Sequence, residues 1–191
     1  MPLPRSSRHA THLRAEDTLL LITDMQEPFL RNIYQRDRVI KNATTMVLAS
    51  PVLRLPIVLT QQNTPRLGNT IPEISQPLRG DFIPFDKLTF SSMNDDAVHS
   101  EVRRSGRKQI LICGVETHIC IMQTTLDLMS LGYQVHVIAD AVGSRTEANW
   151  EIGLARMEQA GALISSTEMA MFELLGEAGT LEFKLILEMI K

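Results

Sequence analysis

The sequence alternates short, continuous apolar runs with segments of helical periodicity, and this alternation sets the fold class. Thr18 to Thr23 reads TLLLIT, and Ile57 to Thr60 reads IVLT. Strands without polar alternation are typical of a parallel sheet that is covered on both faces. Further strands are expected near 82–86 and at 108–113, 134–139 and 162–165. The pattern predicts an α/β protein with a three-layer, Rossmann-like fold and a mainly parallel six-stranded sheet.

Helical segments are expected between these strands, so that helices cover both faces of the sheet. They begin near Asp37, at the capping residues Asn94 and Thr146, and at Ile119. Two more helical patterns close the chain. The proline- and glycine-rich stretch 65–84 is expected to be irregular, and loops of this length inside a compact domain are usually functional.

The order of the strands decides which residues meet. In the common order 3-2-1-4-5-6, strands one and four are neighbours, and ligands bind beyond their carboxyl ends. Asp24 follows the first strand directly, and Cys120 follows the fourth after a short turn. This order would place Asp24 and Cys120 in one crevice, although they lie far apart in the sequence.

Length and charge favour one domain without a nucleic-acid or membrane partner. A single domain is expected over residues 17–191, after a flexible tail of residues 1–16 that is basic and has no acidic residue before Glu16. A docking tail or a short organellar transit peptide are alternative interpretations of these residues. The net charge of −3 gives no reason to expect nucleic acid or an anionic membrane. No oxidising context is visible for the two cysteines, so a cytoplasmic protein with reduced thiols is expected.

Cys120 and Asp24 are the first candidates for chemistry. The unpaired N–H groups at a helix start favour a thiolate, and Asp24 could accept the thiol proton. Each residue also has a plain explanation, because a lone cysteine is often part of the core and an aspartate after a strand is often a cap. Cys113 lies within a strand and is expected to be inert.

Three segments together resemble the isochorismatase-like cysteine hydrolases, the superfamily that includes nicotinamidases and N-carbamoylsarcosine amidases. They are LLITDMQEPF (Leu20 to Phe29), PFDKLTFSSM (Pro84 to Met93) and ICGVETHICIMQTTLDL (Ile112 to Leu128). The subgroup of isochorismatase domain-containing proteins is the best match. The resemblance implies a catalytic triad, and its positions in this sequence are Asp24, Lys87 and Cys120.

The resemblance also implies how the reacting carbonyl would be held. A non-proline cis peptide would join Val115 to Glu116, and the backbone N–H groups of Glu116 and Cys120 would form an oxyanion hole. Positions near the family's substrate site correspond to Gln26, Phe29, Gln62, Phe90 and Thr117. Each of these five residues could equally serve packing or capping. His118 is interpreted as a residue of the helix start or of an interface rather than as the base.

The sequence departs from nicotinamidases where they bind a metal. The corresponding stretch, TQQNTPRLGNT from Thr60 to Thr70, has no histidine and no acidic residue, so neither a catalytic metal nor another cofactor is expected. True isochorismatases lack the nucleophile that Cys120 would provide.

The leading hypothesis is a metal-independent cysteine hydrolase that cleaves a C–N bond of a small amide or related carbonyl compound through a thioester. A noncatalytic oligomeric or binding protein is the alternative. A third, weaker hypothesis is a redox protein that uses Cys113 and Cys120, whose spacing is not C-x-x-C. The resemblance also implies a small-molecule substrate and a homo-oligomer.

Overall fold

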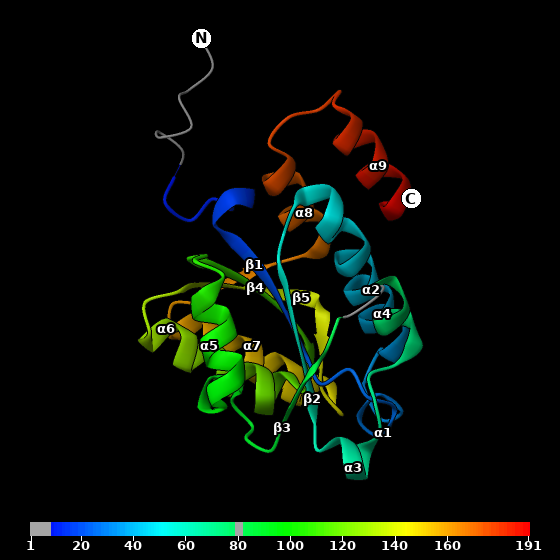
Figure 1. The fold of residues 1–191 in the computed structure, drawn as a ribbon, viewed down its shortest axis with the longest axis vertical. Helices are drawn as coiled ribbons and strands as arrows, with labels where there is room; N and C mark the ends of the chain where they lie inside the picture. Colours follow the sequence, from blue (N-terminus) through cyan, green and yellow to red (C-terminus); the bar gives the residue numbers. More distant parts are fainter. Residues whose placement is uncertain (1–8, 79–81) are drawn as a thin grey trace.

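A computed structural model describes residues 9–78 and 82–191, and its centre is one six-stranded parallel sheet (Figure 1). The strand order is β3-β2-β1-β4-β5-β6, and every neighbouring pair is parallel. The strands are β1 (Thr18–Thr23), β2 (Ile57–Gln62), β3 (Phe85–Lys87), β4 (Gln109–Val115), β5 (Gln134–Gly143) and β6 (Leu163–Ser165). The predicted fold class and strand order are confirmed.

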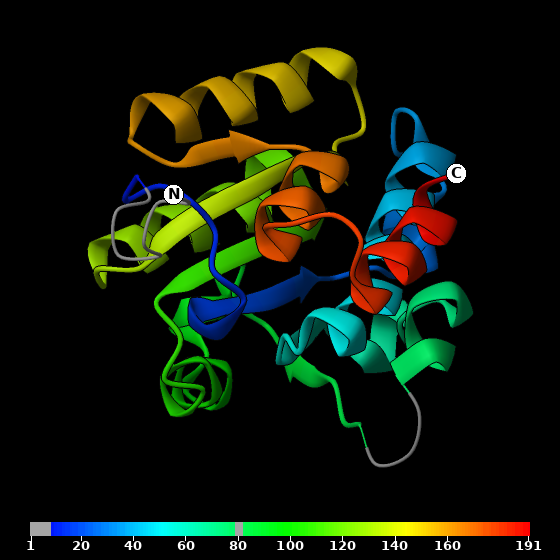
Figure 2. The same cartoon turned by 90° about the horizontal axis from the view of Figure 1, so that it is seen from above.

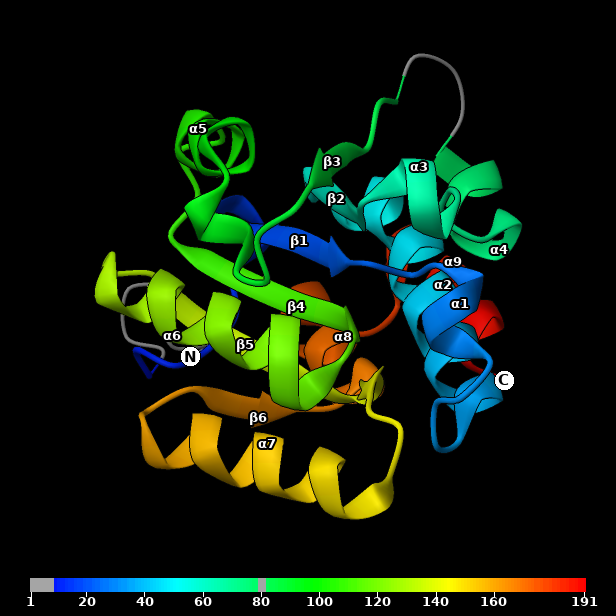
Figure 3. The same ribbon diagram turned by 90° about the horizontal axis from the view of Figure 1, so that it is seen from below.

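Helices pack on both faces of this sheet, as Figures 2 and 3 show from opposite sides. One apolar core joins the sheet to α2 (Arg36–Leu53), α8 (Thr167–Leu175) and α9 (Leu181–Ile190). The second core joins it to α5 (Asp96–Arg104), α6 (Met122–Ser130) and α7 (Glu147–Gln159). All six residues of β1 and all seven of β4 are buried between these layers, which explains why their sequences are continuously apolar.

Shorter elements complete the structure. They are η2 (Ala15–Asp17), α1 (Glu27–Leu30), α3 (Thr64–Leu67), α4 (Pro72–Ser75), η3 (Gln76–Leu78), η4 (Ser92–Asn94) and the π-helical turn η5 (Thr117–Ile121). The stretch predicted to be irregular thus contains two short helices, each with a proline in its first turn. Proline is favoured there because the first N–H groups of a helix have no partner within it.

The capping predictions have different outcomes at the two helices. Thr146 caps α7, and its hydroxyl accepts a hydrogen bond from the Asn149 N–H at 3.2 Å. The prediction that Asn94 caps α5 is wrong, because Asp95 does so and accepts hydrogen bonds from two N–H groups of the first turn. Asn94 instead ends the preceding turn η4.

Two central strands approach each other closely at the end that carries the candidate site. Gly114 of β4 has φ +115°, and a Cβ atom there would lie 2.1 Å from the carbonyl oxygen of Thr23. A side chain would therefore push β4 away from β1. Glycine at this position lets the ends of both strands lie together.

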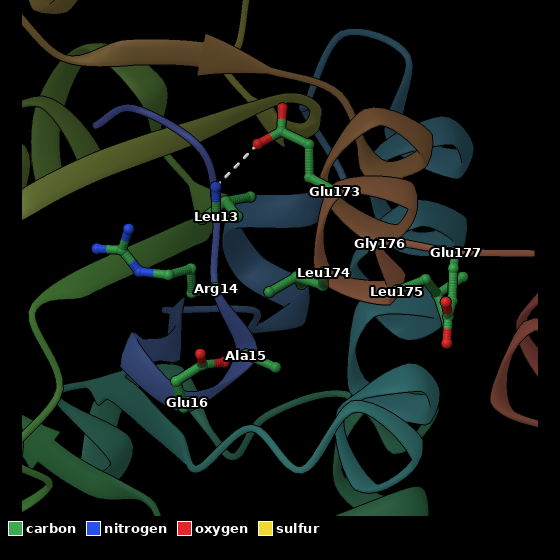
Figure 4. A pocket seen from close by; sticks show the side chains of 9 residues that line it. All are labelled: Leu13, Arg14, Ala15, Glu16, Glu173, Leu174, Leu175, Gly176 and Glu177. Carbon is green, nitrogen blue, oxygen red and sulfur yellow. Dashed lines mark hydrogen bonds between the residues drawn. The ribbon is translucent and has the colours of Figure 1, made fainter. Parts of the chain in front are cut away.

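The described part of the expected N-terminal tail packs against the amino ends of the strands. Leu13 is fully buried, and its N–H donates to the Glu173 carboxylate at 3.0 Å (Figure 4). The Arg14 N–H donates to the Gln109 side chain at 2.8 Å. These residues border a cavity of about 240 Å³ beside the end of α8. Residues 1–8 lie outside the described residues.

Across residues 9–78 and 82–191, no helix combines the length and the apolar character that crossing a membrane would need.

Candidate active site

Three strand ends bring Asp24, Lys87 and Cys120 together. Asp24 follows β1, Lys87 is the last residue of β3, and Cys120 lies in η5, which follows β4. The Asp24 backbone has φ 54°, in the left-handed region, and its N–H donates to the Thr60 carbonyl of β2 at 3.1 Å. Parallel strands end at the same edge of a sheet, so residues from distant parts of the sequence meet here.

Lys87 and Asp24 form a buried ion pair. The Lys87 Nζ lies 2.7 Å from Asp24 Oδ2, and the two side chains are 0% and 1% exposed. The ammonium also donates to Gln62 Oε1 at 2.8 Å and to the Thr89 carbonyl at 3.1 Å, so three acceptors surround it. The second oxygen of Asp24 accepts the Thr60 hydroxyl at 2.8 Å. These bonds fix the orientation of the carboxylate.

The Cys120 thiol is buried and protonated in the resting protein. Burial, and after it the negative charge of Asp24, raise its pKa to about 12. The Lys87 charge and a hydrogen bond from the Glu116 backbone lower the pKa, but by less. The Asp24 carboxylate is close enough to act on the thiol pKa, so a base stands beside the thiol. The thiol pKa therefore lies above its ordinary value, opposite to the expectation from the helix start, because loss of hydration is the largest cause.

Glu116 connects the end of β4 to the segment after β5. The peptide bond between Val115 and Glu116 is cis. The Glu116 carboxylate accepts hydrogen bonds from the Arg145 side chain at 3.0 Å and from the Arg145 N–H at 3.2 Å. His118, on the following turn, pairs with the Ser144 hydroxyl at 2.9 Å. Two contacts to the segment after β5 thus hold the turn that carries Cys120.

A small cavity of about 50 Å³ opens beside the Cys120 thiol. Its lining consists of Phe29, Gln62, Phe90, Val115, Glu116, Ile119 and Cys120. Three of the five residues expected near the substrate therefore line it. Thr117 is fully buried and is not among the lining residues.

Gln26, the fifth expected pocket residue, supports the site from outside the cavity. Its side chain is fully buried, donates to the Gln62 carbonyl at 3.0 Å and to the Gly68 carbonyl, and accepts the Gln62 N–H at 2.7 Å. Gln62 in turn accepts from Lys87. Gln26 thus positions the strand end that holds the lysine.

Sequence reasoning did not identify Thr60, Ile119 and the Glu116–Arg145 pair as parts of the site. Thr60 is the register partner of Thr23 on β2, so its position at a strand end beside Asp24 was the available signal. Ile119 directly precedes the nucleophile. Arg145 ends a segment, Gly132 to Arg145, that continues the resemblance and suggests a structural role, but its contact with Glu116 depends on the exact ends of β4 and β5.

Among the described residues that line the cavity, Glu116 is the only acidic residue, and none is a histidine. Within residues 9–78 and 82–191, no group of three or more histidine, cysteine, aspartate or glutamate side chains is arranged to hold a metal ion. Metal independence stays a prediction for direct measurement.

Comparisons with known proteins agree with this geometry. The isochorismatase domain family matches residues 18–169. The secreted isochorismatase effector Isc1 of Phytophthora sojae is 41% identical over 99% of this chain and 91% of its own length. Isochorismatase domain-containing protein 2 of Bos taurus is 39% identical over 91% of this chain and 83% of its own length.

Among solved structures, the MAR1 ribonuclease of Caenorhabditis elegans superposes with a TM-score of 0.87 at 30% identity, covering 94% of this chain and 92% of its own. The family match spans the strands that carry Asp24, Lys87 and Cys120. The chain is therefore a member of the isochorismatase family, with that family's hydrolase fold.

Proposed function

We propose that this protein is a metal-independent cysteine hydrolase that cleaves a C–N bond of a small amide or related carbonyl compound. The observation that carries the proposal is the convergence of a thiol, a carboxylate and a buried ammonium from three strand ends. The charge of Asp24 acts on the thiol, and Lys87 lies 2.7 Å from the same carboxylate. A nucleophile beside a base, with a third group that orients the base, is the general pattern of covalent catalysis.

The first half of the reaction forms a thioester. Asp24 takes the proton of Cys120 while the sulfur bonds to the substrate carbonyl carbon, and the carbonyl oxygen becomes an oxyanion. The backbone N–H groups of Glu116 and Cys120 would stabilise this charge, a contribution typically worth about 3–4 kcal/mol per donor. Asp24 then protonates the departing nitrogen, the C–N bond breaks, and an amine or ammonia leaves.

The second half releases the acid. Asp24 takes a proton from water while the water oxygen bonds to the thioester carbon. The S–C bond then breaks, the sulfur recovers a proton from Asp24, and a carboxylic acid leaves. Lys87 keeps the Asp24 carboxylate in place through both halves and compensates its negative charge when it is ionised.

The raised thiol pKa is consistent with this sequence of steps. A resting thiolate would need solvation that the buried site does not offer. A thiol beside Asp24 can lose its proton as the S–C bond forms, so that no isolated buried thiolate has to persist.

The test is to trap the thioester on the complete protein. Small amides and activated esters are screened, and the reaction is quenched in acid for peptide mass analysis. The expected result is acyl transfer to Cys120, with turnover reduced at least about 1000-fold in Cys120→Ser and Asp24→Asn. Cys113→Ser is the matched control and should keep full activity. Full turnover by Cys120→Ser, or a stoichiometric metal that turnover requires, would contradict the proposal.

The same experiment tests the alternative functions. A noncatalytic binding protein would show no acylation and no turnover in any arm. RNA is included as a substrate because the similar nematode protein is named a ribonuclease, and RNA cleavage that requires Cys120 would replace the amide proposal.

Cytoplasmic location and homo-oligomer formation are further predictions. Light scattering of the purified protein measures the oligomeric state directly. In α9, Ile186 is fully buried in the protein's own core, whereas Leu181 is 69% exposed and is available to an interface.

A further inference from the structure

We propose that the cavity beside Cys120 selects substrates with a short, apolar and uncharged acyl group, and that Ile119 limits the length of this group. This inference rests on the function proposed above and specifies its substrate class.

The size of the cavity limits the acyl group. It measures about 50 Å³, and one bound water needs at least about 10–15 Å³ of such space, so only a few heavy atoms fit beside the thiol. Of the lining residues, Val115, Glu116 and Gln62 are buried. Phe90 is 57% exposed and stands at the rim. The leaving group can extend past this rim, but the acyl group stays on the sulfur and has to fit inside.

The chemistry of the lining limits the charge of the acyl group. Four lining residues have hydrocarbon side chains. The two polar lining residues besides Cys120 are Gln62 and Glu116, and both already have hydrogen-bond or ion-pair partners. Gln62 accepts from Lys87 and donates to the Leu88 carbonyl at 2.9 Å. The Glu116 carboxylate is paired with Arg145. Among the described residues that line this cavity, none offers an uncommitted charge, so a carboxylate or ammonium on the acyl group would be buried without a partner.

Ile119 is the wall residue best placed to set the chain length. It directly precedes Cys120 in η5, is partly exposed, and lines the cavity. Its replacement by alanine removes three carbon atoms beside the nucleophile. One methylene group in an apolar pocket changes discrimination by about 10–200-fold, so this change should be large enough to measure.

The experiment compares four 4-nitrophenyl esters: acetate, butyrate, hexanoate and monosuccinate. In each case the Cys120 sulfur bonds to the acyl carbon, the bond to nitrophenolate breaks, and the thiol proton passes to Asp24. Peptide mass analysis gives the acylation rate of Cys120. Wild type should prefer acetyl over hexanoyl and succinyl by at least about tenfold.

Variants then identify the wall. Ile119→Ala should raise the ratio of hexanoyl to acetyl transfer by at least about tenfold, with Ile119→Val in between. Met122→Ala is the matched control, because Met122, the first residue of α6, lies just beyond the same turn but packs against the second core rather than lining the cavity. Equal rates for all four esters in wild type, or an unchanged ratio in Ile119→Ala, would overturn the inference.

A binding measurement separates this inference from the proposed function. In Cys120→Ala, the methyl resonance of Ile119, assigned by its loss in Ile119→Val, should shift with acetamide but not with hexanamide or succinamate. Such shifts without any acylation of wild type would overturn the hydrolase proposal and leave the pocket inference standing. Stronger binding of hexanamide or succinamate would overturn the pocket inference itself.

Discussion

Lys87 on the edge strand β3 and Asp24 at the end of the central strand β1 form an ion pair of 2.7 Å that is almost completely buried. Strand β2 lies between β3 and β1 in the sheet, so the two side chains meet across the end of β2. It connects the edge of the sheet to its centre and places a charged pair beside a thiol. The pair therefore serves both stability and the candidate chemistry.

Breaking this pair should destabilise the protein strongly. Removing one partner of a buried pair typically costs about 3–5 kcal/mol, because the other charge stays buried alone. Lys87→Met should lower the free energy of unfolding by this amount, measured by urea denaturation. The double variant Lys87→Met with Asp24→Leu should lose less than the sum of the two single variants.

Arg36→Met is the control for that measurement. It breaks the exposed pair with Glu27, whose atoms lie 3.0 Å apart, and exposed pairs contribute at most about 1 kcal/mol. A double variant whose loss equals the sum of the single losses would show that Lys87 and Asp24 do not interact energetically.

The reactivity of Cys120 should follow the charges around it. Wild-type labelling by iodoacetamide should stay slow through neutral pH and rise only toward the pKa of about 12. Asp24→Asn removes a negative charge that raises this pKa, so it should accelerate labelling while it abolishes turnover. Mass analysis of the labelled peptides measures both cysteines, and Cys113, whose pKa burial also raises to about 12, is the internal reference. Slower labelling in Asp24→Asn would contradict the assigned role of its charge.

His136 should make the protein sensitive to acid. Burial lowers its pKa from 6.5 to about 4, against an opposing effect of Glu173. Because the unfolded chain binds the proton first, stability is fully present above pH 6.5 and is lost as the pH falls toward 4. The loss should reach about 3 kcal/mol. His136→Gln should flatten this part of the stability curve, measured by urea unfolding at a series of pH values. His99→Gln controls for loss of a histidine elsewhere, and a similar flattening there would refute the assignment.

Gly153 should be needed to hold the turn that carries the nucleophile. A Cβ atom at this position in α7 would lie 3.1 Å from His118 Cα and 3.2 Å from the Thr117 carbonyl carbon. Both are backbone atoms of η5, so Gly153→Ala should displace this turn. The rate of Cys120 acylation should therefore fall by a larger factor than the equilibrium constant for folding. Ile152→Ala changes a neighbouring side chain that is 65% exposed and should leave acylation unchanged. Normal acylation in Gly153→Ala would show that the turn tolerates the displacement.

The sequence was most informative where burial is complete. The bounds of β1 were predicted correctly, because an uninterrupted apolar run of this length is typical of a strand buried on both faces of a parallel sheet. Strand β5 was expected to end at Ala139 but continues past Asp140 to Gly143, where the pairing with β4 shifts register. Local composition does not report a shift of that kind.

The candidate site was predictable in position but not in its electrostatics. The positions of Asp24, Lys87 and Cys120 follow from strand ends and from the resemblance of three motifs. The direction of the thiol pKa depends on how deeply the turn is buried, and that is a property of packing between distant segments. The contact between Glu116 and Arg145 likewise exists only once β4 and β5 have their final ends.

The Cys120 thiol is buried, and its raised pKa keeps it protonated near neutral pH. Peroxides and disulfides attack thiolates, so the resting protein should survive oxidative stress without repair of its nucleophile. Its vulnerability lies elsewhere, in small neutral electrophiles that pass the rim and resemble a substrate. The extent of inactivation would then depend on the concentration of such electrophiles around the protein rather than on the redox state of the compartment.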